Sequence, residues 1–386
     1  MNIYINAASM TPIRSKGQNE TIMLTYVVNE LIKQHNVDVN NLQAVILSNS
    51  FGAISLRQAG IRPQVWLRHL DLDPIPFYSI ESACAGGSIG LDLACQMLEP
   101  GGNIMVLGVE YISNLPIETK MMGITQGVPE DEREHLRSEF GPVAEGTLFM
   151  GFNEIWGRHL LESNLATVEQ IAATAAKSRF HGSLNPLAAH QQALSIDRIL
   201  RARKVSSVLT VPMCSSFTDG AAGLIISTEK TESSVKVRSC KSFSGNGTME
   251  YHERLKKCVR HTVAAAGMEI KDFKCMEIHD ATSVEELYSL ETLEIFEKGQ
   301  AGAHTLAGDT TLGGKGPIIN PSGGLVSRGH PIGATGLCQL YELYLQIAGK
   351  AEQRQIDNLN IALALNAGGI ITMDAASVAV TILEKA

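Results

Sequence analysis

An alternation of strand-like and helix-like segments occurs twice along the chain, and it restricts the fold more than any other feature. In the first half, apolar strand-like runs and helical stretches alternate at 3–8, 22–35, 44–48, 56–70, 75–80, 84–98 and 103–109. In the second half they alternate at 235–244, 251–266, 275–278, 284–296, 334–347, 361–365 and 377–383. Such alternation is typical of βαβ units that share a sheet. We predict an α/β fold made of two βαβαβ halves.

A long segment without a clear strand, residues 113–205, interrupts the first half, and a strand at 221–227 resumes the pattern. The segment contains mixed helices, a charged patch and turns. A connection of this length inside a compact fold usually serves the function, so we expect it to cover a site. We therefore divide the chain into residues 1–230, which include this insertion, and residues 231–386.

The composition excludes several classes of protein. The net charge of −8 and the lack of long Lys/Arg blocks argue against a nucleic-acid surface. The seven cysteines are scattered without a Cys-x-x-Cys motif, so we expect no disulfide framework and no zinc site, and a reducing, cytoplasmic location. We expect neither a signal peptide nor a membrane span, because no apolar run approaches the ~18 residues that a span needs.

Cys84 has the most reactive setting among the cysteines. It follows the strand-like run 75–80 and sits at the first turn of a helix that is nearly apolar all round. Unpaired N–H groups at a helix start favour a thiolate, so we expect this thiol to ionise more easily than a free one. Gly86 and Gly87 leave room for a substrate beside the sulfur. Cys84 is therefore either a nucleophile that carries an acyl group or a buried structural cysteine.

Three more polar residues fall at comparable places. His279 follows the strand at 275–278, Asn366 follows the strand at 361–365, and His330 lies in a glycine-rich turn just before a helix. Ligands collect at the carboxyl ends of strands in folds of this kind. We therefore expect these side chains to meet Cys84, and this convergence favours the catalytic interpretation.

The motifs around these residues resemble those of the thiolase superfamily over essentially the whole chain. The matching stretches are 82–88, which contains Ser-Ala-Cys-Ala-Gly-Gly-Ser, 212–222, and 320–336, which contains Gly-His-Pro. The His279-Asp280 pair resembles the branch of sterol-carrier-protein-type and archaeal thiolases. The resemblance implies the doubled α/β fold in αβαβα layers, and coenzyme A thioesters as substrates. It implies no bound cofactor or metal, and a homodimer or tetramer.

The resemblance also implies roles for the residues. Cys84 would attack an acyl-CoA carbonyl, and His330 would activate the thiol or donate a hydrogen bond to a thioester oxygen. The backbone N–H groups of Cys84 and Gly368 would form an oxyanion hole, with Asn366 in support. Lys177, Arg179 and His181 in the insertion are candidates for binding the phosphates of coenzyme A, although surface charges of a helix look the same.

Two departures from the family pattern matter. The position of the second cysteine in degradative thiolases holds Asn366, and the position after His-Asp, where the sterol-carrier-type branch has its proton-shuttling cysteine, holds Ala281. The remaining set of Cys84, His279 and His330 resembles the Cys-His-His arrangement of ketoacyl synthases, which form their carbanion by decarboxylation. A catalytic or oxyanion role for His279 is expected on this basis.

Four functions remain open from the sequence. The leading one is a thiolase-like acyltransferase that uses a cysteine acyl-enzyme on acyl-CoA to form or cleave a C–C bond. The second is decarboxylative condensation with malonyl-type donors. The third is a thiolase-like subunit that is active only with a small zinc-ribbon and OB-fold partner protein, and the fourth is a structural subunit without catalysis.

Overall fold

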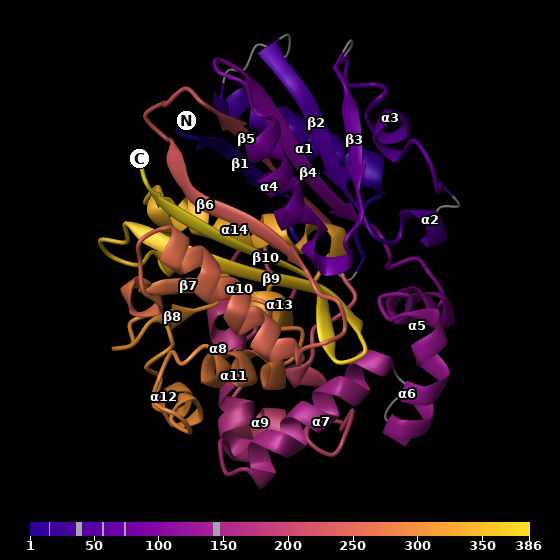
Figure 1. Cartoon of the computed structure of the whole chain (residues 1–386), viewed down its shortest axis with the longest axis vertical. Helices are drawn as coiled ribbons and strands as arrows, with labels where there is room; N and C mark the ends of the chain where they lie inside the picture. Colours follow the sequence, from indigo (N-terminus) through magenta and orange to yellow (C-terminus); the bar gives the residue numbers. More distant parts are fainter. Residues whose placement is uncertain (15, 36–40, 56–57, 73–74, 142–146) are drawn as a thin grey trace.

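The computed structural model describes the chain except for residues 15, 36–40, 56–57, 73–74 and 142–146 (Figure 1). Its frame is a mixed sheet with the strand order β3-β2-β4-β5-β1-β6-β10-β9-β7-β8. The strands of the first half are β1 (Tyr4–Met10), β2 (Leu42–Ser48), β3 (Phe77–Ile80), β4 (Asn103–Glu110) and β5 (Gly220–Ser227). Those of the second half are β6 (Val235–Ser244), β7 (Cys275–Ile278), β8 (Ile318–Ile319), β9 (Ile361–Ile371) and β10 (Asp374–Lys385).

The strand order shows the same pattern twice, mirrored about the junction of β1 and β6. In the first half β2 runs parallel to β3 and β4, while β4 and β1 run antiparallel to β5. In the second half β7 runs parallel to β8 and β9, while β9 and β6 run antiparallel to β10. The predicted duplicated α/β fold is confirmed. The boundary between residues 230 and 231 stays a prediction, and it falls in the turn between β5 and β6.

Helices form three layers around these strands. Helix α1 (Glu20–His35) packs on the outer face of the first half, and α10 (Tyr251–Ala265) packs on that of the second half. Between the halves lie α4 (Gly86–Met97) and α14 (Thr335–Ile347), each in contact with strands of both halves. These two helices are largely buried because their apolar residues face sheet on two sides. The αβαβα layering follows from this arrangement.

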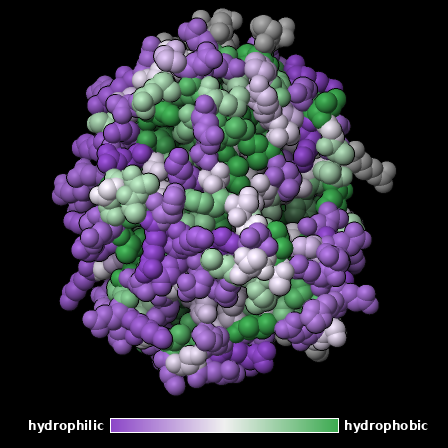
Figure 2. Space-filling model, in the orientation of Figure 1, coloured by the Kyte–Doolittle hydropathy of each residue, from purple (hydrophilic) through white to green (hydrophobic). Residues whose placement is uncertain are grey.

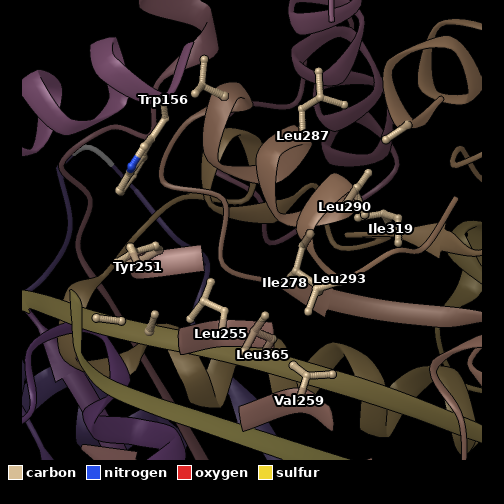
Figure 3. Close-up of a cluster of buried hydrophobic side chains, with 14 of the residues drawn as sticks. Trp156, Tyr251, Leu255, Val259, Ile278, Leu287, Leu290, Leu293, Ile319 and Leu365 are labelled. Carbon is tan, nitrogen blue, oxygen red and sulfur yellow. The ribbon is translucent and has the colours of Figure 1, made fainter. Parts of the chain in front are cut away.

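The described part of the insertion consists of helices joined by turns and irregular segments, and no named strand falls within it. Its helices are α5 (Ile117–Thr125), α6 (Arg133–Phe140), α7 (Leu148–Glu162), α8 (Val168–Ser183) and α9 (Ile196–Leu200). Helix α8 packs against α11 (Ser283–Thr292), α12 (Ala301–Leu306) and α13 (Gly324–Ser327) of the second half. Figure 3 shows part of the apolar core beneath, where Trp156 of α7 lies beside Tyr251 with ring centroids 4.9 Å apart.

Two of the predicted elements differ most from the structure. The helix expected at 56–70 is replaced by two short helices, α2 (Gly52–Ser55) and α3 (Arg62–Leu67), and residues 56–57 lie outside the described part. Pro63 lies in the first turn of α3, where its missing N–H costs no hydrogen bond within the helix. The strand expected at 361–365 continues to residue 371, because β9 and β10 form a hairpin paired up to Ile371 and Asp374. Asn366 therefore lies within a strand and not at its end.

No helix in the described part of the chain is long and apolar enough to cross a bilayer. The face seen in Figure 2 is mostly hydrophilic, with apolar patches between the polar residues.

Candidate active site

A cavity of about 1080 Å³ holds most of the residues that the sequence singled out. Cys84, His279, His330 and Gly368 line it, and so do residues from the helices of the insertion. The cavity lies where β3 and β7 end, because Cys84 and His279 follow these strands. Its size suits a small-molecule ligand. The insertion thus covers the cavity, as the sequence predicted.

Cys84 sits in a single 3₁₀ turn, Ala83–Ala85, that leads directly into α4. The residue before it, Ala83, has a φ of 47°, a left-handed conformation that side chains other than glycine rarely adopt. Two hydrogen bonds hold this residue: its N–H donates to Oε1 of Glu81 at 2.8 Å, and its carbonyl accepts from Oγ of Ser50 at 3.0 Å. The strained turn therefore presents the thiol to the cavity, as strained residues often do at functional sites.

His330 lies beside the thiol in a defined tautomer. Its Nε2 is 3.3 Å from Sγ of Cys84, and its Nδ1 is 2.7 Å from Oγ1 of Thr335. The Thr335 hydroxyl donates its own hydrogen to the carbonyl of Pro331 at 3.0 Å, so it accepts from Nδ1–H of His330. A neutral imidazole with its proton on Nδ1 has a lone pair on Nε2. His330 is thus set to accept the proton of the Cys84 thiol.

His279 is held in the opposite tautomer. Its Nδ1 accepts from Nδ2 of Asn366 at 3.0 Å, and Oδ1 of Asn366 in turn accepts from Oγ of Ser88 at 3.4 Å. The proton of a neutral His279 therefore resides on Nε2. The two imidazole rings meet edge to face with their centroids 5.5 Å apart. One histidine at this site is arranged to accept a proton, and the other is arranged to donate a hydrogen bond.

Burial decides whether Cys84, His279 and His330 are charged. It raises the pKa of the Cys84 thiol above its ordinary range, and the charges of Glu285 and Glu110 raise it further. Burial also lowers the pKa of His279 to about 3 and that of His330 well below its usual value. The expectation that Cys84 ionises more easily than a free thiol was wrong, because desolvation outweighs the helix terminus. At neutral pH the site therefore holds a neutral thiol and two neutral imidazoles.

The backbone of Gly368 approaches that of Cys84 closely. A Cβ atom on Gly368 would lie 2.5 Å from the carbonyl oxygen of Ser82 and 2.9 Å from the backbone nitrogen of Cys84. Only glycine permits this approach, since real Cβ contacts are never this short. The two backbone segments that the sequence assigned to an oxyanion hole therefore lie side by side.

The three residues predicted to bind the phosphates of coenzyme A lie in different environments. Lys177 is buried and binds a carboxylate oxygen of Glu286 and the carbonyl of Ile319. His181 is fully buried, with Nδ1 against the carbonyl of Asn320 and Nε2 accepting a backbone N–H. A role for these two in phosphate binding was wrong, because they point into the protein and their polar atoms are occupied. Arg179 does line the cavity, and its Nε has no hydrogen-bond partner among the described residues.

Cys84, His279 and His330 each offer one atom that could bind a metal, and these atoms lie within 4.8 Å of one another. Three such ligands resemble an open zinc site, which keeps a position for water or substrate, and not a closed structural one. The absence of a metal at this site stays a prediction.

Sequence reasoning missed several residues of the site. Thr335 orients His330, and it is the threonine of the quoted Gly-His-Pro motif, five residues after the histidine. Thr218 accepts the backbone N–H of His330 at 2.8 Å, which explains why the stretch 212–222 belongs with the site. Tyr251 and Glu285 also line the cavity. An acidic residue in the first turn of a helix gives no signal of its own, because it is ordinary there.

Known proteins are similar to most of this chain. Two family models match: "Thiolase, N-terminal domain" at residues 3–193 and "Thiolase C-terminal domain-like" at residues 241–384. The sterol carrier protein 2 of Bos taurus is 30% identical over 318 residues, which are 78% of this chain and 58% of the relative. The chain thus spans little more than half the length of that protein. The acetyl-CoA acetyltransferase of Methanothermobacter thermautotrophicus is 28% identical over 353 residues, 88% of each chain.

Among solved structures, one titled "Ltp2-ChsH2(DUF35) aldolase" superposes with a TM-score of 0.80 at 14% identity, covering 100% of this chain and 98% of that one. This likeness concerns the fold alone. The two family models together match most of the chain and carry the family assignment. The chain belongs to the thiolase superfamily.

Proposed function

We propose that this chain is a thiolase-type acyltransferase that carries an acyl group on Cys84 and forms or cleaves a C–C bond between coenzyme A thioesters. The observation that carries the proposal is the contact of 3.3 Å between Cys84 Sγ and His330 Nε2, with the lone pair of the imidazole turned toward the thiol. A thiol beside such a base becomes a nucleophile when the proton is transferred.

In the acylation step, His330 takes the thiol proton as Sγ attacks the thioester carbonyl. The negative charge on the carbonyl oxygen falls between the backbones of Cys84 and Gly368, where N–H groups stabilise it. The thiolate of coenzyme A then leaves and takes the proton from His330. The low pKa of His330 makes its protonated form short-lived, so it returns the proton readily.

In the condensation step, a second thioester forms an enolate whose carbon attacks the acyl group on Cys84. The Nε2–H of His279 donates to the enolate oxygen, because Asn366 fixes that tautomer. Thiolysis is the same sequence in reverse. Arg179, with Arg203 and Lys204, supplies positive charge at the cavity for the phosphates of coenzyme A.

A second candidate is decarboxylative condensation with a malonyl-type donor. It is favoured by Ala281 and Asn366, whose side chains cannot remove a proton from the α-carbon. Loss of carbon dioxide would generate the enolate without a base.

We further propose that the protein is a homodimer or tetramer. Strand β3 is an edge of the sheet, and its Tyr78 is 42% exposed, so the edge is open to pairing with a second copy.

A small zinc-ribbon and OB-fold protein is a further candidate partner, supported by the similar aldolase structure whose name includes a DUF35 component. Size-exclusion chromatography with light scattering tests the oligomer, and co-purification tests the partner.

The test of the function measures products from acetyl-CoA and longer acyl-CoA donors, with and without malonyl-CoA. New 3-oxoacyl-CoA from acyl-CoA alone, absent with Cys84→Ala, supports the thiolase reaction. Product and carbon dioxide from malonyl-CoA only would support the decarboxylative candidate instead. Turnover retained by Cys84→Ala would exclude both.

A further inference from the structure

Removal of a proton from the α-carbon of a thioester needs a base. Most of the polar groups around the Cys84 thiol cannot act as that base. The lone pair of His330 Nε2 is directed at Cys84, and Nε2 of His279 already carries a proton. The side chains of Ala281 and Asn366 do not titrate. The condensation step therefore requires another group that reaches the same cavity.

Glu285 is a carboxylate in the first turn of α11 that lines this cavity with only 3% of its surface exposed. Its Oε1 accepts from the hydroxyl of Tyr251 at 2.7 Å, and its Oε2 accepts from the backbone N–H of Ala281 at 3.2 Å. No Lys, Arg or His side chain in the described part of the chain forms an ion pair with it. The carboxylate is thus held at Ala281 by neutral donors alone.

The adjacent residue Glu286 shows the contrast. It is fully buried, forms an ion pair with Lys177, accepts from Nδ2 of Asn320, and does not line the cavity. Burial without a cation raises the pKa of Glu285 to about 7. Among the charged groups, Glu285 also has the largest effect on the pKa of the Cys84 thiol. Glu285 can therefore gain and lose a proton near neutral pH within electrostatic reach of the sulfur.

We propose that Glu285 is the general base and acid of the condensation step, an inference that rests on the proposed acyltransferase function. The C–H bond at the α-carbon of the second thioester breaks, its proton goes to the Glu285 carboxylate, and the electron pair forms the enolate. The enolate carbon then bonds to the acyl carbon on Cys84, and the C–S bond breaks. Glu285 returns its proton to the sulfur, which restores the thiol and the carboxylate.

Tyr251 positions this carboxylate. Its ring packs against Trp156, as Figure 3 shows, and its hydroxyl fixes Oε1. The Ala281 N–H holds the second oxygen, so both oxygens of the carboxylate are fixed by hydrogen bonds.

The test separates the two half-reactions. Acylation of Cys84 by acetyl-CoA is followed by intact-protein mass spectrometry, and exchange of the α-hydrogens of acetyl-CoA is followed in D₂O by NMR. We expect Glu285→Gln to acylate within about threefold of the wild type and to lose exchange by about 100-fold or more. Glu285→Asp should retain part of the exchange, and formate should restore part of it to Glu285→Ala. The exposed Glu253→Gln serves as a control for removal of charge on a neighbouring helix.

Exchange within threefold of the wild type in Glu285→Gln or Glu285→Ala would overturn the assignment. So would a wild-type enzyme that acylates but exchanges no α-hydrogen, a result that leaves the acyl-enzyme intact and favours decarboxylation. Failure of the wild type to acylate at all would instead refute the proposed function.

Discussion

The Nδ1 atom of His330 lies 2.7 Å from the hydroxyl oxygen of Thr335, which donates its own hydrogen to a backbone carbonyl. This relationship fixes the lone pair of His330 on Nε2, toward Cys84. Asn366 imposes the other tautomer on His279, although both rings are buried and uncharged. Two chemically identical side chains, 5.5 Å apart, are thereby prepared for different tasks.

Thr335→Val should slow acylation of Cys84, because the Nδ1–H of His330 loses its acceptor and the tautomer is no longer fixed. We expect a decrease of about 10-fold to 100-fold, since general-base catalysis contributes about 100-fold or more in all. The buried donor left unpaired should also cost about 1–3 kcal/mol of unfolding free energy. Stopped-flow release of coenzyme A and urea unfolding measure the two effects. Thr335→Ser keeps the hydroxyl and should behave like the wild type; equal loss in both variants would contradict the assignment.

Gly368→Ala should remove most of the acylation activity, because the added Cβ would push β9 away from Cys84. Loss of one oxyanion donor typically costs about 100-fold to 1000-fold in kcat. Gly60→Ala is the matched control, since a Cβ at Gly60 would meet no atom of the described residues within 4 Å. Steady-state kinetics should separate the two variants, and similar activity in both would argue against an oxyanion hole at this place.

Alkylation of Cys84 by iodoacetamide should accelerate with pH without a plateau near neutrality. The raised pKa means that the thiol stays protonated until strongly alkaline pH, so the thiolate fraction grows about tenfold per pH unit below that pKa. Peptide mass mapping distinguishes Cys84 from the other cysteines. The alkylation rate of an ordinary exposed thiol, with a pKa of about 8.5, stops rising at a lower pH and serves as the reference. A plateau for Cys84 below pH 8 would show a stabilised thiolate instead.

Lys177→Met should destabilise the protein without a specific effect on binding of coenzyme A. It leaves the carboxylate of Glu286 buried without its cation, and breaking a buried pair in this way costs about 3–5 kcal/mol. Addition of Glu286→Gln should recover part of that loss. Arg179→Gln should instead raise the KM for acyl-CoA, with a smaller change in unfolding free energy. Denaturant unfolding and steady-state kinetics on the same variants test both statements.

The sequence predicts this site well where short motifs fix the backbone. Cys84 follows a strand and precedes a helix, and His330 stands in a glycine-rich turn, so both positions could be inferred from local patterns. Thr335 was contained in the same motif, but its task depends on a hydrogen bond that no spacing reveals. The duplicated fold could also be predicted from the sequence, because each half repeats the same order of strands and helices.

The errors come from effects that arise only on folding. Lys177 and His181 lie on a helix whose polar residues look solvent-facing in sequence, but α8 packs against three helices of the second half and buries them. The thiol of Cys84 was expected to ionise easily from its place at a helix start, and burial reverses that trend. Glu285 escaped notice because its partner, Tyr251, is 34 residues away in sequence.

Intact-protein mass spectrometry after incubation with a panel of acyl-CoA donors tests the central claim most directly. The account predicts a mass gain of one acyl group on the wild type, located on the peptide with Cys84 and absent from Cys84→Ala. Cys214→Ala, which removes another cysteine of the cavity, should still gain the mass. No adduct with any donor, or an adduct that persists in Cys84→Ala, would contradict the claim that Cys84 carries the acyl group.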